Sequence, residues 1–215
     1  MKHPDKDPAL LLIVSGPAGS GKTTLCDRLM ATHPELQRVV TCTTRKPRPG
    51  EVDGVDYHFF SEDQFLREIE AGSFLEHAQI HGATRYGVLR RELRDKLGKE
   101  TSLLLNIDVQ GAATFREAAA RDDQLCTRIV SVFILPMSLD VIRERLESRG
   151  TDDEVSMRKR LASAKAEMEQ WPNYDYCIQS GSRDGDFRRL DSILLAERLR
   201  VSRLVGKRAP EMIQG

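Results

Sequence analysis

The sequence predicts an α/β fold in which helices cover both faces of a mostly parallel sheet. Apolar runs of strand length recur along the chain at residues 10–15, 102–107 and 129–135. Such continuous runs are typical of parallel strands, because both faces of a parallel sheet are buried. Helical patterns alternate with these runs, which favours strand–helix–strand units. The length of 215 residues is sufficient for one sizeable domain.

The remaining elements follow from local patterns. The first strand leads through a glycine-rich turn into a helix at 22–31, and a short strand is expected at 39–43. Ser61 and Gln64 form a capping box, in which two side chains cap the first turn of a helix. Thr151 and Glu154 repeat this pattern. Further strands are expected at 74–80 and 177–178, and further helices at 112–120, 138–149, 151–170 and 187–203.

Two segments interrupt this alternation and are expected to form excursions from the core. Residues 40–89 are broken by prolines and glycines and are less parallel in character, and residues 137–160 are helical and rich in arginine. We expect one domain over residues 9–204, with flexible tails at 1–8 and 205–215. Its core comprises residues of about 9–39, 90–136 and 161–204.

Composition and charge narrow the class of protein. Basic and acidic residues balance at 33 each, which argues against a general nucleic-acid binder. No apolar run approaches the ~20 residues that span a bilayer, and the run at 9–14 is too short for a signal-peptide core. The four cysteines show no C-x-x-C spacing, and we expect them to be buried and reduced. We therefore expect a cytoplasmic protein without a membrane partner.

A phosphate-binding loop follows the first strand. Residues 16–23, GPAGSGKT, fit the pattern G-x-x-x-x-G-K-[ST] at every required position, between a strand and a helix as the motif demands. The glycines let backbone N–H groups close around phosphate oxygens. Lys22 would reach the β- and γ-phosphates, and the Thr23 hydroxyl would ligate Mg²⁺. A chance glycine-rich turn would not match the whole pattern and its flanks, but the motif alone predicts only a nucleotide binder.

A second anion site is predicted by two arginines and two tyrosines. Arg45 and Arg48 lie three residues apart in a loop bracketed by prolines, an arrangement suited to clamping one phosphate monoester. Tyr57 and Tyr86 can each donate a hydroxyl hydrogen bond to the same phosphate. Surface ion pairs are the plain alternative for the two arginines. Their place beside the phosphate loop and the tyrosines favours the phosphate site.

Residues 41–57, TCTTRKPRPGEVDGVDY, resemble the signature T-T-R-x-P-R-x-G-E of the guanylate kinase family. Further similar segments are residues 74–78, 86–87, 107–111, 143–160 and 196–200, so that the resemblance covers about 9–204. It implies the three-layer P-loop NTPase fold with a parallel central sheet, an inserted GMP-binding subdomain at 40–89 and a helical lid at 137–160. The implied reaction is ATP + GMP = ADP + GDP, with dGMP as a further acceptor, in purine nucleotide metabolism and GMP recycling.

The resemblance also implies a role for individual residues, with Mg²⁺ bound alongside ATP. The implied ATP contacts are Gly16, Pro17, Ala18, Gly19, Ser20, Gly21, Lys22, Thr23, Thr24 and Arg145, with Thr23 on the metal. The implied GMP contacts are Thr41, Arg45, Arg48, Tyr57, Glu76, Tyr86 and Asp108. The implied catalytic residues are Lys22, Arg45, Arg149 and Arg160.

The chemistry of these residues agrees with the implied roles. Guanine presents two adjacent N–H donors that the Glu76 carboxylate can accept, whereas adenine offers an acceptor there. Lid arginines would bring positive charge to the transferred group and exclude water. The acceptor is already a phosphate oxygen, so no general base is required.

Four positions depart from the family pattern. Thr41 stands where Ser is usual, which keeps the hydroxyl, and Val88 replaces a Ser or Thr that contacts guanine. Asn106 replaces an Asp near Mg²⁺, and Ser180 replaces an adenine-side Asn. Two other functions stay open: a kinase of a phosphorylated sugar such as ribose 1,5-bisphosphate, and a non-catalytic interaction module of guanylate-kinase type. Whether the protein is a monomer or a homo-oligomer also stays open.

Overall fold

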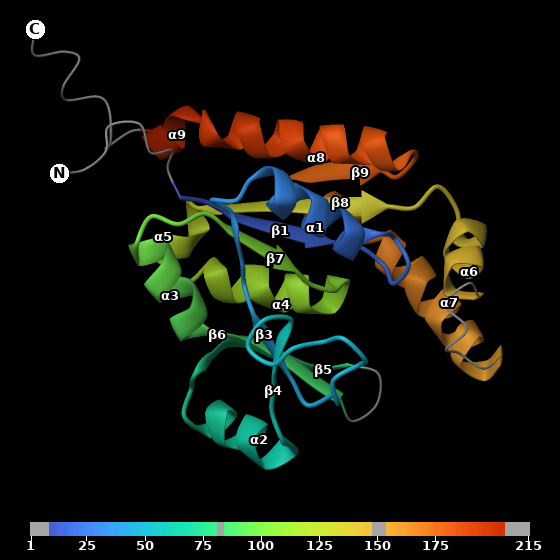
Figure 1. The fold of residues 1–215 in the computed structure, drawn as a ribbon, viewed down its shortest axis with the longest axis horizontal. Helices are drawn as coiled ribbons and strands as arrows, with labels where there is room; N and C mark the ends of the chain where they lie inside the picture. The colour runs from blue at the N-terminus through green and yellow to red at the C-terminus, as the bar shows by residue number, and fades with distance from the viewer. Residues whose placement is uncertain (1–8, 81–83, 148–153, 205–215) are drawn as a thin grey trace, which may run out of the picture.

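The computed structural model describes residues 9–80, 84–147 and 154–204 and is built around a five-stranded sheet (Figure 1). The strands lie in the order β2 (Gln37–Arg38), β7 (Leu103–Asn106), β1 (Leu11–Ser15), β8 (Ile129–Leu135), β9 (Tyr176–Gln179). All of their pairings are parallel. The predicted α/β fold with a parallel central sheet is therefore confirmed.

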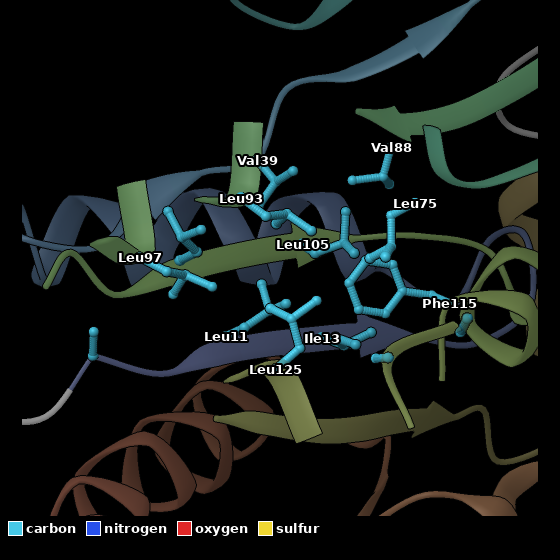
Figure 2. Close-up of a cluster of buried hydrophobic side chains, with 14 residues drawn as sticks. Leu11, Ile13, Val39, Leu75, Val88, Leu93, Leu97, Leu105, Phe115 and Leu125 are labelled. Atoms are coloured by element: carbon cyan, nitrogen blue, oxygen red, sulfur yellow. The ribbon is translucent and has the colours of Figure 1, made fainter. Parts of the chain in front are cut away.

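Helices cover both faces of this sheet because successive side chains of each strand point to opposite faces. On one face, Leu12 and Val14 pack against α1 (Lys22–Thr32) and α8 (Arg183–Arg198). On the other, Leu11 and Ile13 pack against Phe115 and the helices α3 (Arg90–Gly98), α4 (Val109–Ala119) and α5 (Asp123–Cys126), as Figure 2 shows. Every residue of β1 is buried, which places the end of β1 at the centre of the molecule.

A second sheet of four strands lies beside the α4 face of the first (Figure 1). Its order is β4 (Tyr57–Phe59), β3 (Thr41–Thr43), β6 (Thr84–Leu89), β5 (Phe74–Ile80). The helix α2 (Glu62–Glu70) packs on it through Phe65, whose ring stacks on Phe74 at 4.5 Å between centroids. The predicted capping box of Ser61 and Gln64 opens this helix.

Two helices project from the end of the central sheet between β8 and β9 (Figure 1). They are α6 (Leu139–Glu147) and α7 (Glu154–Met168), which pack on each other through Ile142 and Ala164. The chain returns through the 3₁₀ turn η1 (Trp171–Asn173), and α9 (Val201–Leu204) ends the described part. No helix within the described ranges combines the length and the apolar character needed to cross a membrane.

Several predicted elements were wrong in their bounds. The strand expected at 39–43 is shorter, because only Thr41–Thr43 (β3) pair, with β4 and β6 of the second sheet, while β2 at Gln37–Arg38 lies before it and pairs with β7 of the first sheet. Strand β6 and helix α3 were not predicted. Helix α4 begins earlier than expected because Asp108 caps it, and α8 begins earlier because Ser182 does. The predicted cap Thr151 lies outside the described residues.

The four cysteines were expected to be buried and reduced, and two of them are buried. All four are free thiols; Cys26 and Cys42 are buried, but Cys126 and Cys177 are exposed. Burial raises the pKa of both buried thiols to about 12, so they carry no charge at neutral pH.

Candidate active site

The phosphate loop, residues 16–23, joins the central strand β1 to α1 in a backbone path that needs glycine. Gly16 has a φ of 144°, and a Cβ there would lie 2.5 Å from the carbonyl oxygen of Ile134. Gly19 and Gly21 also have positive φ, of 81° and 93°. These conformations are rarely open to other residues. The sequence pattern therefore reflects the geometry of the loop as well as its chemistry.

The start of α1 is arranged to receive an anion. Its N-cap is Gly21, which has no side chain to cap the helix, so its first N–H groups face the loop. Lys22 extends over the loop, where its Nζ donates to the carbonyl oxygens of Gly16 at 2.6 Å and Pro17 at 2.9 Å. The first N–H groups of a helix and a lysine together form a phosphate cradle.

The residues next to this cradle fit a magnesium ion that binds with a triphosphate. Nδ2 of Asn106, at the end of β7, donates to Oγ1 of Thr23 at 3.2 Å. Mg²⁺ in nucleotide sites takes few protein oxygens and completes its shell with phosphates and water. Among the described residues no group of three or more His, Cys, Asp and Glu side chains could hold a metal on its own. The donor set at Thr23 therefore suits a metal carried by the nucleotide.

The phosphate loop and the second sheet line one cavity of about 280 Å³. From the loop side it is lined by Ala18, Gly19, Gly21, Lys22, Thr23 and Thr24, and from the other side by Thr41, Arg48, Tyr57, Glu76, Tyr86 and Asp108, all predicted site residues. Gly87, Asn106 and Ile107 complete it. Strand register explains the far wall. Thr41 lies opposite Tyr57, and Thr43 lies opposite Tyr86, so their side chains share one face of the sheet.

A buried carboxylate closes the inner end of this cavity. Glu76 is only 5% exposed, and its Oε2 has no hydrogen-bond partner. Burial and, to a smaller extent, the carboxylate of Asp108 raise the pKa of Glu76 to about 8. One oxygen of Asp108 accepts the N–H of Gly111 as the cap of α4. An acidic group with an unused acceptor at the end of a pocket is suited to a ligand that brings N–H donors.

Val88 lies beside Glu76 but belongs to the core. The two are cross-strand partners in the β5–β6 pair. Val88 is completely buried in the cluster that includes Leu75 and Phe115, as Figure 2 shows. This apolar neighbour contributes to the dry surroundings of the Glu76 carboxylate.

Arg45 and Arg48, the two arginines of the signature, make different contacts. Arg48 is exposed and lines the cavity. Arg45 is held by Glu51, whose two oxygens accept from Nη1 and Nη2 at 2.9 Å each. The guanidinium of Arg45 also lies 5.3 Å from the centre of the Tyr57 ring, and its pKa is raised, first by the hydrogen bonds to Glu51.

A second cavity of about 460 Å³ opens on the other side of the phosphate loop. It is lined by Gly19, Ser20, Gly21, Thr24, Leu25, Arg28, Ile134, Ser180, Gly181, Arg183 and Asp186. The hydroxyl of Ser180 donates to Asp186 Oδ2 at 2.9 Å within the buried wall. Space next to a phosphate cradle is where the rest of a nucleotide would extend.

The predicted lid arginines are only partly placed. Arg145 lies in α6 and Arg160 lies in α7 by their backbone, and Arg149 falls outside the described residues. The structure therefore brings the phosphate loop, the predicted second phosphate site and Glu76 to one cavity, and the contribution of the lid stays a prediction.

The fold and the cavity together define the class of protein. A phosphate loop after the central strand of a parallel sheet, with a wall containing Arg48, Tyr57 and Tyr86 facing it across a cavity, is the arrangement of a P-loop phosphotransferase that binds nucleotides. Comparison with known proteins identifies the family, because residues 9–197 match guanylate kinase. The chain belongs to the guanylate kinase family.

Individual relatives agree over nearly the whole chain. It is 40% identical over 197 residues to a guanylate kinase of Paramagnetospirillum magneticum, covering 92% of this chain and 89% of that one. It is 41% identical over 194 residues to one of Cereibacter sphaeroides, covering 90% and 89%. The crystal structure of guanylate kinase from Anaplasma phagocytophilum is similar with a TM-score of 0.73 at 32% identity, covering 92% and 90%.

Sequence reasoning assigned no role to two acidic residues that the structure places at the site. Glu51 was noted only as part of the signature, although its position three residues after Arg48 and next to a turn glycine allows it to fold back. Glu167, which lines a hollow together with Asp108, was not noted at all. A glutamate in the last turn of a helix opposes the helix dipole, which was the available signal.

Proposed function

We propose that this protein transfers the γ-phosphoryl group of Mg·ATP to GMP, giving ADP and GDP, and that it also accepts dGMP. The observation that carries this proposal is the buried Glu76 carboxylate in the same cavity as the phosphate loop. The cavity thus joins a cradle for the donor phosphates to an acceptor for the N–H edge of guanine. Family membership supports the same reaction.

On the donor side, the loop N–H groups and Lys22 would hold the β- and γ-phosphates of ATP. The Thr23 hydroxyl, positioned by Asn106, would hold Mg²⁺, which supplies positive charge to the phosphate oxygens when bound. The adenosine would occupy the cavity beside Ser180 and Asp186.

On the acceptor side, Arg48, Tyr57 and Tyr86 would hold the phosphate of GMP, and Arg45 would act with them. Glu76 would accept the N1–H and N2–H groups of guanine, with Thr41 and Asp108 at the same wall. A phosphate held at this wall presents its oxygen toward the loop across the cavity. Positioning and positive charge then supply most of the catalysis, since phosphoryl transfer needs little covalent help from the protein.

The lid and the domain boundaries are part of this proposal. We assign α6 and α7 to the lid at 137–160, with Arg145, Arg149 and Arg160 closing on the transferred group. Residues 40–89 would form the GMP-binding subdomain, which agrees with the second sheet lying wholly between Thr41 and Leu89. A cytoplasmic location in purine nucleotide metabolism completes the proposal.

The two other functions are less well supported. A sugar phosphate can offer hydroxyl donors to Glu76 but has no pair of adjacent N–H donors on one planar edge, so it accounts for the buried carboxylate less specifically than guanine does. An interaction module has no need for a phosphate loop with Lys22 and Thr23 in place.

The test is a coupled assay of ADP formation with Mg·ATP and each of GMP, dGMP, AMP, CMP, UMP and ribose 1,5-bisphosphate. We expect turnover with GMP and dGMP, and a loss of at least about 100-fold in kcat/KM for GMP in Glu76→Ala. Glu169→Ala, an exposed glutamate on the surface, is the matched control. Turnover with ribose 1,5-bisphosphate, or with none of the acceptors, would overturn the proposal.

A further inference from the structure

The cavity of about 460 Å³ beside the phosphate loop, which we call the donor-side cavity, contains a hydroxyl whose hydrogen is already in use. Ser180 lies directly after β9, lines this cavity and is only 5% exposed. Its backbone N–H donates to the carbonyl oxygen of Leu135 at 2.8 Å, which fixes the residue beside the end of β8. Its hydroxyl donates to Oδ2 of Asp186 at 2.9 Å, so the hydroxyl hydrogen is directed at that carboxylate.

Asp186 is held in place to accept this hydrogen. It lies in the first turn of α8 and is 7% exposed. Its other oxygen, Oδ1, accepts the backbone N–H of Gly181 at 2.9 Å, and Nη1 of Arg189 lies 3.4 Å from the same oxygen. An ionised carboxylate has no hydrogen to give, so the bond with Ser180 can run in one direction only. Asp186 therefore takes the hydrogen of the Ser180 hydroxyl and leaves its lone pairs for a ligand.

A nucleobase that reaches Ser180 would thus meet a hydrogen-bond acceptor. Adenine has an amino group at position 6, which donates, whereas guanine and hypoxanthine have an oxo group there, which accepts. The amino group can give a hydrogen to the Ser180 oxygen, but an oxo oxygen would face its lone pairs with no hydrogen between them. Because unpaired buried polar groups cost binding free energy, this wall favours a base with an amino group.

Two arginines line the same cavity but are less suited to read the base. Arg28 and Arg183 are both exposed, so water competes for their N–H groups whichever base is bound. Nη1 of Arg28 also donates to Asp184 at 2.6 Å, and its guanidinium lies 4.2 Å from the centre of the Phe187 ring. The buried Ser180 hydroxyl is therefore the better discriminator between an amino and an oxo group.

We propose that Asp186 selects the donor nucleotide by orienting Ser180, so that the protein prefers ATP to a triphosphate with an oxo group at position 6. Asp186 is a positioning residue, because it acts through the Ser180 hydroxyl. This inference rests on the proposed function for the adenosine lying in the donor-side cavity and for the transfer to GMP.

Two variants separate the hydroxyl from its orientation. Ser180→Ala removes the acceptor. Asp186→Asn keeps the shape of the side chain, and with its oxygen still accepting from Gly181 it turns an amide N–H toward Ser180, whose hydrogen is then free for the ligand. Ser192→Ala and Asp191→Asn make the same changes on residues of α8 outside the lining of the donor-side cavity, and are the matched controls. Circular dichroism and Tm show that each variant is folded.

ATP and ITP are the matched pair of donors, because ITP carries hypoxanthine in place of adenine. Steady-state kinetics at saturating GMP give kcat/KM for each donor. Calorimetry gives the dissociation constants of ADP and IDP without any acceptor nucleotide. The calorimetry is done with Glu76→Ala added to each protein, so that the N1–H group of hypoxanthine finds no carboxylate in the acceptor cavity.

We expect kcat/KM to favour ATP over ITP about tenfold, and the dissociation constants to favour ADP over IDP by a similar factor. Ser180→Ala should bring both ratios to within about twofold of unity by weakening the adenine nucleotide. Asp186→Asn should reverse the preference, and the two controls should match the parent.

Equal use of ATP and ITP by the parent, or a folded Asp186→Asn variant that keeps the parent ratio, would overturn the inference. A preference for ADP over IDP in a protein that transfers no phosphoryl group to GMP would refute the proposed function alone.

Discussion

Both terminal nitrogens of Arg45, Nη1 and Nη2, donate hydrogen bonds of 2.9 Å to Glu51, one to each carboxylate oxygen. The same carboxylate accepts the backbone N–H of Arg48 at 2.7 Å, so one side chain fixes the loop that carries both arginines. The side chains of Arg45 and Glu51 are each only 18% exposed. The loop that carries both arginines is therefore held in shape by the protein before any ligand arrives.

Removal of Glu51 should weaken GMP binding without affecting ATP. In Glu51→Ala, Arg45 loses its partner and the backbone of Arg48 loses its acceptor, so we expect KM for GMP to rise about tenfold. Unfolding should become easier by about 1 kcal/mol, as for a partly exposed ion pair. Glu62→Ala removes another Arg–Glu pair, with Arg85, and serves as the control. An unchanged KM for GMP in Glu51→Ala would refute this positioning role.

The raised pKa of Glu76 predicts a pH-dependent affinity for GMP. With a pKa of about 8, the carboxyl holds its proton in the free protein at neutral pH. Guanine brings two N–H donors to this group, so binding favours the ionised form and expels the proton. KM for GMP should therefore fall about tenfold between pH 7 and pH 9 and level off above the pKa.

The range from pH 7 to pH 9 lies above the second ionisation of a phosphate monoester, near 6, so the charge of the GMP phosphate stays constant over it. Glu76→Gln cannot ionise and should flatten the profile. KM for ATP, measured in the same buffers at constant ionic strength, should change little. A KM for GMP that stays constant over this range in the parent protein would show that Glu76 does not titrate on binding.

Gly16 and Gly98 should respond in opposite ways to substitution by alanine. At Gly16 the backbone is left-handed and a Cβ would lie 2.5 Å from a carbonyl oxygen, so Gly16→Ala should lower stability by about 2 kcal/mol or more. Gly98 ends α3, and a Cβ there would meet no atom within 4 Å, so Gly98→Ala should raise stability by about 0.5 kcal/mol. Urea denaturation measures both. Equal stability of the two variants would contradict the strained path of the loop.

Asn106 is expected to set the magnesium requirement. Replacing its amide by a carboxylate in Asn106→Asp offers the oxygen that Mg²⁺ prefers next to Thr23. We expect the Mg²⁺ concentration for half-maximal activity to fall about threefold to tenfold. Asn173→Asp makes the same change of charge on an exposed residue and should leave it unchanged. A higher Mg²⁺ requirement in Asn106→Asp would show that the amide is the better partner of Thr23.

The sequence predicted the elements whose signal is local. The strand before the phosphate loop, the loop itself and the capping box at Ser61 each depend on neighbouring residues, and the structure has all three. The cavity lining also agrees with most of the predicted contacts, because the signature residues occupy strands whose register fixes their facing.

What the sequence did not predict depends on distant partners. Residues 39–43 are apolar enough for one strand, but strand pairing is set elsewhere in the chain: Gln37–Arg38 pair with β7, and Thr41–Thr43 pair with β4 and β6. Val88 was interpreted through the polar contact it lacks, whereas its side chain packs in the core cluster. Glu167 and Asp108 line one hollow although about 60 residues separate them in the chain, and no local pattern predicts this.

The most direct test of the central claim is to identify the products of one reaction. The protein is incubated with Mg²⁺, GMP and ATP labelled in its γ-phosphate, and the nucleotides are separated by ion-exchange chromatography. We predict that the label moves to the β-phosphate of GDP, with ADP formed in equal amount. Label released as inorganic phosphate, or left in ATP while relatives of the family turn over in the same buffer, would contradict the proposed reaction.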